Sequence, residues 1–199
     1  AGEQQGRTLA DILLGKVNPS GKLNVSFPRS TGNTPCFYNH FVTDREEPFD
    51  QPGTPEEPKG HYIFDKPEPL WNFGHGKSYT TFDYVDCALS DTLLAASDTL
   101  KVSVMIKNTG RCDGKEVVQL YVRDKVSTVA TPIQQLKAFQ KVLVKSGESQ
   151  CVELSLPIAE LALYNAKMEE VVEPGDFEIQ IGAASDDIRF KKTITINRK

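Results

Sequence analysis

Carboxylates are the most numerous side chains in this sequence that could do chemistry, because a pair of them can serve as base or nucleophile and as acid. The glutamates at 46–47 and 56–57 lie in a proline-rich stretch, which favours solvated surface charges. Glu3 is expected in the first turn of a helix, where its charge interacts with the helix dipole. Glu116 is expected to begin a strand and to make a structural hydrogen bond. None of these carboxylates is predicted to be catalytic.

Histidines and cysteines are the next candidates, as metal ligands or nucleophiles. No pair of cysteines has the CxxC spacing of a zinc site, and the histidines lie far apart in sequence, so no metal site is predicted. No glycine-rich phosphate loop and no Gly-x-Ser-x-Gly motif is present, and no cofactor is predicted. The spacing of the cysteines selects none of their three pairings, but a core of this size needs no disulfide, which favours free thiols. These residues are His40, His61, His75, Cys36, Cys87, Cys112 and Cys151.

Aromatic residues gather in the stretch PLWNFGHGKSYTTFDY, residues 69–84. Such side chains could stack on the apolar faces of sugar rings, or they could fill the crevice between two domains. The second role is favoured, because Phe82 and Tyr84 alternate straight into a strand pattern. Gly74 and Gly76 are expected where the backbone bends or approaches another segment closely. The candidate substrate-binding residues of the junction are Trp71, His75 and Lys77.

Composition limits the class of protein. The chain has 199 residues, of which 39% are hydrophobic and 25% charged, as in a soluble globular protein. The net charge of -4 without a basic block argues against a nucleic-acid partner and against a polybasic membrane anchor. No apolar run reaches the roughly 20 residues of a membrane helix. Because the sequence begins inside a helical pattern without Met, we expect a piece of a longer protein.

The elements that must position these residues change along the chain. Residues 3–15 predict an amphipathic helix that ends at Gly15, and residues 22–28 predict a short strand. One helix and one strand cannot form a core, so we expect them to be the remnant of an α/β domain. Residues 29–70 are rich in proline and predict an extended linker that runs over the surface of something else. From about residue 80 onward, some seven short alternating strands predict a two-sheet sandwich.

Three motifs give the sequence a resemblance to a known family. GRTLADILLGKVNPSGKLNVSFPRS resembles the end of the α/β domain of glycoside hydrolase family 3, and PLWNFGHGKSYTTFDY resembles the junction that follows it. KNTGRCDGKEVVQLYVRD resembles the signature of that family's fibronectin type III-like domain. The sequence departs from the family at Lys77, where Leu is usual, at His75, where Tyr is frequent, and at Asp44, which replaces a linker Gly.

The resemblance implies a mainly β fold: an immunoglobulin- or fibronectin type III-like sandwich at 76–199. A helix-strand remnant of an α/β domain at 1–30 and an extended linker and junction at 31–75 precede it. Family members hydrolyse β-glycosides with retention, using two carboxylates that lie upstream of the region matched here. The chain is therefore expected to be the non-catalytic C-terminal scaffold of a β-glucosidase-like enzyme, periplasmic or secreted. The implied partners are the catalytic domains of the same polypeptide, an oligosaccharide substrate and, as a further candidate, a second copy of the chain.

Two other functions remain open from the sequence. A carbohydrate-binding or surface-interaction module would show a row of exposed aromatics on one sheet face. The strand aromatics are few, and most fall on the apolar phase of their strands: Tyr121, Phe139, Phe177 and Phe190. A sandwich that only stabilises its parent, or forms a dimer contact, is hardly distinguished from the scaffold by sequence.

Overall fold

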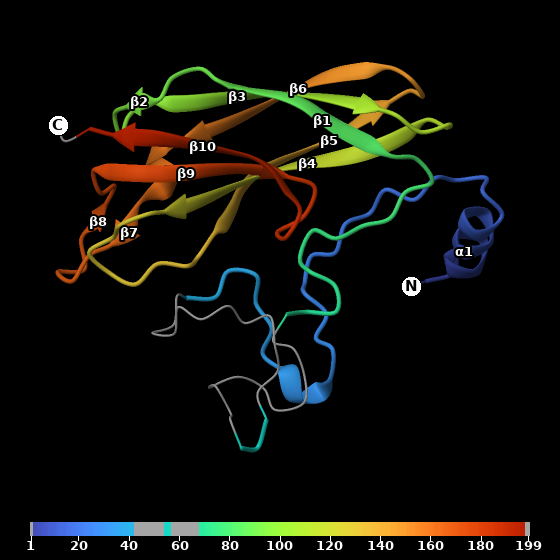
Figure 1. The fold of residues 1–199 in the computed structure, drawn as a ribbon, viewed down its shortest axis with the longest axis horizontal. Coiled ribbons are helices and arrows are strands. Elements are labelled where there is room, and N and C mark those ends of the chain that lie inside the picture. The colour runs from blue at the N-terminus through green and yellow to red at the C-terminus, as the bar shows by residue number, and fades with distance from the viewer. Residues whose placement is uncertain (1, 42–53, 57–67, 198–199) are drawn as a thin grey trace.

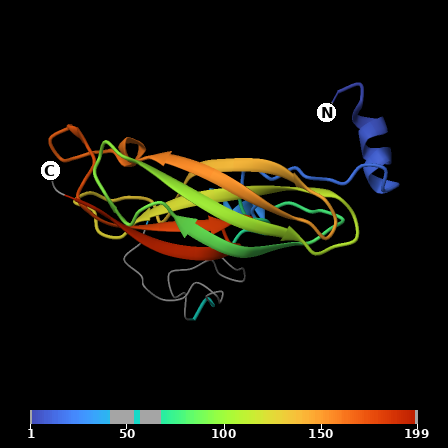
Figure 2. The same cartoon turned by 90° about the horizontal axis from the view of Figure 1, so that it is seen from above.

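Two β-sheets packed face to face form the main body of the molecule (Figures 1 and 2). The computed structural model describes residues 2–41, 54–56 and 68–197. Within them, one sheet has the order β1-β3-β6 and the other the order β2-β10-β9-β4-β5. Neighbouring strands are antiparallel except for β2, which is parallel to β10. The sandwich that the sequence predicts is confirmed.

The strand bounds follow the predicted alternating segments. In the first sheet they are β1 (Phe82–Leu89), β3 (Thr99–Asn108) and β6 (Ser149–Pro157). In the second they are β2 (Leu93–Leu94), β4 (Gly114–Asp124), β5 (Gln135–Val144), β9 (Gly175–Gly182) and β10 (Ile188–Ile196). A small hairpin of β7 (Leu163–Tyr164) and β8 (Glu170–Val171) follows the 3-10 turn η2 (Ile158–Leu161).

The core lies between the two sheets and is built from alternate residues of each strand. In β3, Leu100, Val102, Val104 and Ile106 are fully buried, whereas Lys101 and Lys107 between and after them are exposed. Burying one such side chain contributes about 1.5–3 kcal/mol. The inward-facing residues of β6 and β9 repeat the pattern. Burial of these alternate apolar side chains between the sheets stabilises the sandwich.

Strand β4 is buried on both of its faces. Val118, Leu120 and Val122 face the core, and the alternate residues Gln119 and Tyr121 are also buried, at 3% and 0% exposure. Tyr38 of the linker covers Tyr121, and Gly74 of the junction and Ala183 of the β9–β10 turn accept hydrogen bonds from the Gln119 amide. The linker runs over this sheet, where the Leu136 N–H donates to the Tyr38 hydroxyl at 3.2 Å. The surface that the linker was expected to cross is therefore that of the sandwich itself, at least for residues up to 41.

The N-terminal helix α1 (Gln5–Leu13) stands apart from the sandwich (Figure 1). It starts two residues later than expected, and its first turn contains no acidic residue, so the helical position predicted for Glu3 is wrong. Gly15 ends the helix as predicted, with a φ of 71°. The Gly15 N–H bonds the Ile12 carbonyl and the Lys16 N–H bonds the Asp11 carbonyl, which is the Schellman pattern. No residue of the helix is buried.

The strand predicted over residues 22–28 is wrong for most of its length. Only Phe27 forms a bridge, with Trp71, and the two segments that run side by side in Figure 1 are joined by separate hydrogen bonds. The Leu23 N–H bonds the His75 carbonyl at 2.8 Å, and the Gly74 N–H bonds the Leu23 carbonyl at 2.8 Å. A 3-10 turn η1 (Thr31–Asn33) follows. The predictions for residues 44, 46–47, 57 and 61 lie outside the described residues.

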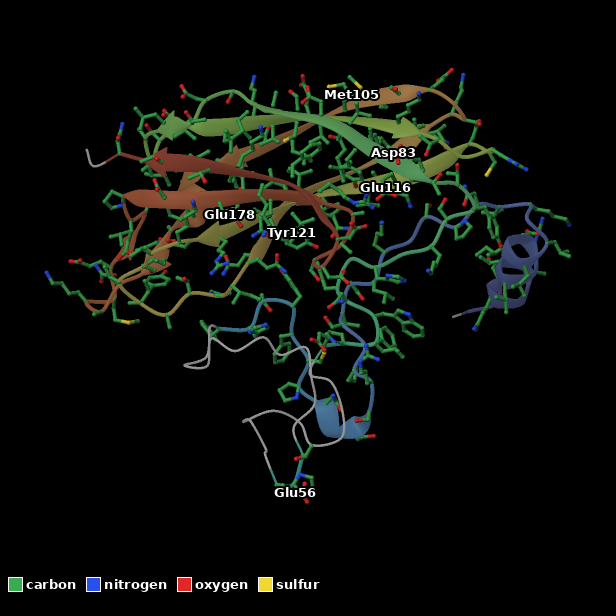
Figure 3. All side chains as sticks on the ribbon, in the orientation of Figure 1. Glu56, Asp83, Met105, Glu116, Tyr121 and Glu178 are labelled. Carbon is green, nitrogen blue, oxygen red and sulfur yellow. The ribbon has the colours of Figure 1, made fainter. Side chains whose placement is uncertain are left out.

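Three further findings concern the described residues alone. All four cysteines are free thiols, as favoured from the sequence. Among residues 2–41, 54–56 and 68–197, no helix is long and apolar enough to cross a membrane. Glu56 is exposed, as expected of a solvated linker charge, and it lies far from the sandwich in Figure 3.

Candidate functional site

A polar cavity of about 350 Å³ lies where the junction meets the sandwich. Its walls come from residues 20–22, from the junction 75–80, from the starts of β1 and β4, and from the turn between β9 and β10. Ligand pockets in proteins commonly measure about 300–1,000 Å³. The side chains that give the cavity its character are Lys22, His75, Lys77, Tyr84, Glu116 and Arg189.

A buried ion pair forms the floor of this cavity. Glu116, at the start of β4, is 6% exposed, and its Oε1 lies 3.0 Å from the Lys22 ammonium nitrogen. The Tyr84 hydroxyl donates to the same oxygen at 3.3 Å, and the Gly182 carbonyl lies equally close. Figure 3 labels Glu116 on the side of the sandwich that faces the incoming N-terminal segment. The structural hydrogen bond predicted for Glu116 is thus confirmed.

Tyr84 is held in its neutral, proton-donating form. Burial raises the pKa of its phenol, and the negative charge of Glu116 beside it raises the pKa further. At neutral pH the hydroxyl therefore keeps its proton and can donate to the carboxylate.

Glycines allow Lys22 to reach Glu116. A Cβ on Gly76 would lie 2.5 Å from the Gly21 carbonyl oxygen, so only glycine permits the two segments to approach so closely. Gly74 has a φ of 82°, and a Cβ there would lie 2.4 Å from the Gln119 side-chain oxygen. The bends and close approaches predicted for Gly74 and Gly76 are both confirmed.

The turn between β9 and β10 forms a second, fixed wall. The Arg189 guanidinium donates to both carboxylate oxygens of Asp187, at 2.5 and 2.9 Å, and lies 5.7 Å above the Tyr84 ring. The preceding residue, Asp186, accepts a hydrogen bond from the Asn72 side-chain amide at 2.6 Å. The Asp187–Arg189 pair and the cation–π contact fix Arg189 over Tyr84, and the Asn72–Asp186 hydrogen bond joins the turn to the junction.

The structure separates the three candidate residues of the junction. His75 and Lys77 both line the cavity, His75 half-buried and Lys77 exposed. Trp71 lies outside it and packs edge-on against Phe27, with ring centroids 5.9 Å apart. Sequence reasoning missed Lys22, Tyr84 and Arg189 as cavity residues, because each comes from a different segment and nothing local signals that they meet.

The junction aromatics fill space between segments, as favoured from the sequence. Phe73 stacks on Tyr38 at 4.1 Å, and Tyr38 meets the edge of the buried Tyr121 ring at 5.9 Å. Of the four strand aromatics, Tyr121 and Phe177 are buried and Phe190 is half-buried. Phe139 alone of these four is exposed, at 66%. These four residues therefore form no row of exposed aromatics on a sheet face.

Within the part of the chain that the structure describes, no group of three or more His, Cys, Asp and Glu side chains is placed to hold a metal ion. His40 lies in the linker, where its ring nitrogen is 3.0 Å from the Phe41 carbonyl, and His75 is at the cavity. His61 lies outside the described residues.

Comparison with known proteins gives the chain a family context. Residues 1–79 match the glycosyl hydrolase family 3 C-terminal domain, and residues 116–185 match the fibronectin type III-like domain. A periplasmic β-glucosidase of Salmonella typhimurium is 38% identical over 95% of this chain and 24% of its own length. A β-xylosidase of Formosa agariphila is 40% identical over 100% of this chain and 26% of its own length.

Solved structures agree with these matches. A β-glucosidase from Listeria innocua, crystallised with glucose, superposes with a TM-score of 0.85 at 36% identity, over 97% of this chain and 26% of that one. A β-glucosidase from Erythrobacter marinus gives a TM-score of 0.86 at 38% identity, over 98% of this chain and 24% of that one. The chain thus spans about a quarter of the length of the relatives it matches. It belongs to glycoside hydrolase family 3 and corresponds to the C-terminal region of that family's enzymes, with a fibronectin type III-like domain.

Proposed function

We propose that this chain is the C-terminal scaffold region of a retaining β-glycosidase that acts on β-glucosides or related oligosaccharides. The parent's nucleophile and acid/base residue belong to domains outside this region, and the chain alone is inactive. Relatives with the names β-glucosidase and β-xylosidase, aligned over nearly the whole chain, support the reaction class. One observation supports the scaffold role most strongly. The linker and junction have apolar side chains on two sides, and among the described residues the sandwich covers only one of these sides.

The covered side fastens the junction to the sandwich. Phe73 and Tyr38 stack over Tyr121, and the Gln119 side-chain amide donates to the Ala183 carbonyl at 2.6 Å and to the Gly74 carbonyl at 3.4 Å. Aromatic pairs of this kind contribute about 0.5–1.5 kcal/mol beyond their buried area. The junction is therefore a fixed platform on the sandwich.

The opposite side of the junction is apolar and open. Phe27, Leu70 and Trp71 are 42–46% exposed although they contact one another through a ring contact and backbone hydrogen bonds. Helix α1 likewise leaves Leu9 and Leu13 exposed, at 54% and 72%. Neighbouring exposed apolar side chains mark an interaction surface. We infer that the catalytic domains of the same polypeptide cover it.

The division into 1–30, 31–75 and 76–199 fits this role. The first part would complete an α/β domain, the second would join the domains, and the third would support them. A periplasmic or secreted location is supported by the periplasmic β-glucosidase of Salmonella typhimurium. The net charge of -4 gives no support to a nucleic-acid partner. A homodimer stays a proposal, which sedimentation of the purified chain would test.

Hydrolysis of an aryl β-glucoside by the purified 199-residue chain tests the absence of a catalytic centre. We expect no turnover beyond a contaminant, and any residual rate should survive the substitution of each acidic residue in turn. A rate that one substitution abolishes, such as Glu116→Gln, would show that the chain has its own active site.

A further inference from the structure

We propose that the cavity above Glu116 binds a neutral, polyhydroxylated ligand of the size of a sugar ring. This proposal concerns only residues of this chain and does not depend on the reaction of the parent enzyme. It rests on which hydrogen-bonding groups line the cavity and on how their charges are arranged.

The floor of the cavity offers an unused acceptor. Lys22 and Tyr84 both bind Oε1 of Glu116, and no described residue bonds the other oxygen, Oε2. Oε2 is not among the buried atoms left without a partner, so solvent reaches it. Because Glu116 lines the cavity while its side chain is only 8% exposed, this oxygen opens into the cavity. A carboxylate oxygen held in this way accepts a hydrogen bond from a ligand hydroxyl.

A donor lies directly beside this acceptor. The Lys22 ammonium has three N–H groups, and Glu116 is its one ion-pair partner among the described residues. The Lys22 nitrogen lies 3.0 Å from Oε1 of the same carboxylate, so the carboxylate and the ammonium can bind two neighbouring hydroxyls of one ring, one hydroxyl donating and the other accepting. Vicinal hydroxyls with both roles are the characteristic groups of sugars.

Most of the charges that line the cavity are paired with one another, so the cavity is not built to bind an ionic ligand. Lys77 and Lys115 at the rim are exposed and make no ion pair with any described residue, so they repel a cation. At the floor the Lys22 ammonium compensates the Glu116 carboxylate, and on the wall Arg189 compensates Asp187, so neither pair presents a free charge to a ligand. A neutral ligand needs no counter-charge in the cavity and can accept hydrogen bonds from the rim.

The cavity also has the rigidity and the apolar surface that such a ligand needs. The half-buried Phe82 ring lines one side and can pack against the C–H groups of a sugar ring. Arg189, fixed by Asp187 and lying over the Tyr84 ring, holds the opposite wall. A preformed site loses little entropy when the ligand binds.

Titration of the isotope-labelled 199-residue chain, followed by the NMR signals of its backbone amides, tests the proposal with D-glucose as probe. We expect saturable shifts at Gly76, Ser78 and Ala184, with a Kd on the order of millimolar. D-glucuronate, which has the same ring with a carboxylate, should bind no more tightly than D-glucose. Shifts that do not saturate or lie elsewhere, or tighter binding of glucuronate, would overturn the proposal.

Three variants locate the site. Glu116→Gln should weaken glucose binding at least tenfold, whereas Glu153→Gln, the same change at an exposed position on β6, should leave it unchanged. If Glu116→Gln does not fold, glucose binding is measured with Ser20→Trp instead. The indole would fill the cavity without removing the ion pair, so this variant should also lose glucose binding. Unchanged glucose binding by a folded Glu116→Gln or by Ser20→Trp would contradict the assignment.

Discussion

Substitution of Asn108 tests how the sandwich and the junction are joined. The Asn108 side chain is fully buried at the end of β3 and makes four hydrogen bonds. Its amide nitrogen donates to the Cys112 and Val144 carbonyls, each at 2.9 Å. Its oxygen accepts from the Gly110 N–H at 3.0 Å and from the Thr80 hydroxyl at 2.5 Å. One side chain thus fixes the β3–β4 turn, the end of β5 and the junction.

The expected loss in Asn108→Ala follows from these four bonds. A hydrogen bond contributes about 1 kcal/mol net, and a buried group left unpaired costs about 1–3 kcal/mol. The Thr80 hydroxyl can rotate to another partner, but the three backbone groups cannot. We therefore expect the free energy of unfolding to fall by about 3–5 kcal/mol, which lowers the Tm by roughly 10–20 °C for a domain of this size.

Urea and thermal denaturation, followed by circular dichroism, measure this loss. Asn165→Ala is the matched control, because Asn165 also bonds two backbone N–H groups and one side chain, but it is only half-buried and its hydrogen bonds are exposed to solvent. Water can replace those bonds, so the control should lose less than about 1 kcal/mol. Equal losses in the two variants would refute the reasoning that burial makes the Asn108 bonds indispensable.

Three further predictions concern the linker, the junction and a surface carboxylate. Gly74→Ala should destabilise the fold more than Gly147→Ala, as measured by urea denaturation: both have φ near 80°, but nothing lies within 4 Å of a Cβ at Gly147. Equal losses would mean that the close approach at Gly74 relaxes freely. Tyr38→Ala should speed limited proteolysis within residues 31–41, since it removes the stack that holds this segment; an unchanged cleavage rate would contradict that role. The hydroxyl and N–H of Thr128 lower the pKa of the Glu173 carboxyl, so Glu173 stabilises the fold above its unfolded pKa of about 4.3 and this contribution is lost as pH falls through the folded value. The wild type should therefore exceed Glu173→Gln in urea midpoint at pH 7 but not near pH 3, and a constant gap would contradict the assignment.

The sandwich could be predicted from sequence because its signal is local. Alternation such as that of Leu100, Val102, Val104 and Ile106 identifies a strand and its buried face without any knowledge of the partner strands. The glycines of the junction could be interpreted in the same way, since the conformation that Gly74 needs is a property of one residue.

The cavity and the cover over β4 could not be predicted, because they depend on contacts between distant segments. Lys22 and Glu116 are far apart in the chain, and neither side chain signals the other. Tyr121 lies opposite the core-facing phase of β4, where solvent exposure is the usual outcome, and Tyr38 of the linker packs against it. The strand expected at 22–28 has the right alternation, but beside it lies only the irregular 70–75 segment and no regular strand.

We propose that the open apolar side of the junction and helix α1 docks onto the catalytic domains. Sedimentation of the 199-residue chain with separately expressed catalytic domains of the proposed parent enzyme tests this docking most directly. We predict a one-to-one complex that Trp71→Ser weakens and that Tyr164→Ser, at an exposed aromatic in the β7–β8 hairpin, does not. No complex, or one that both variants weaken equally, would contradict the account.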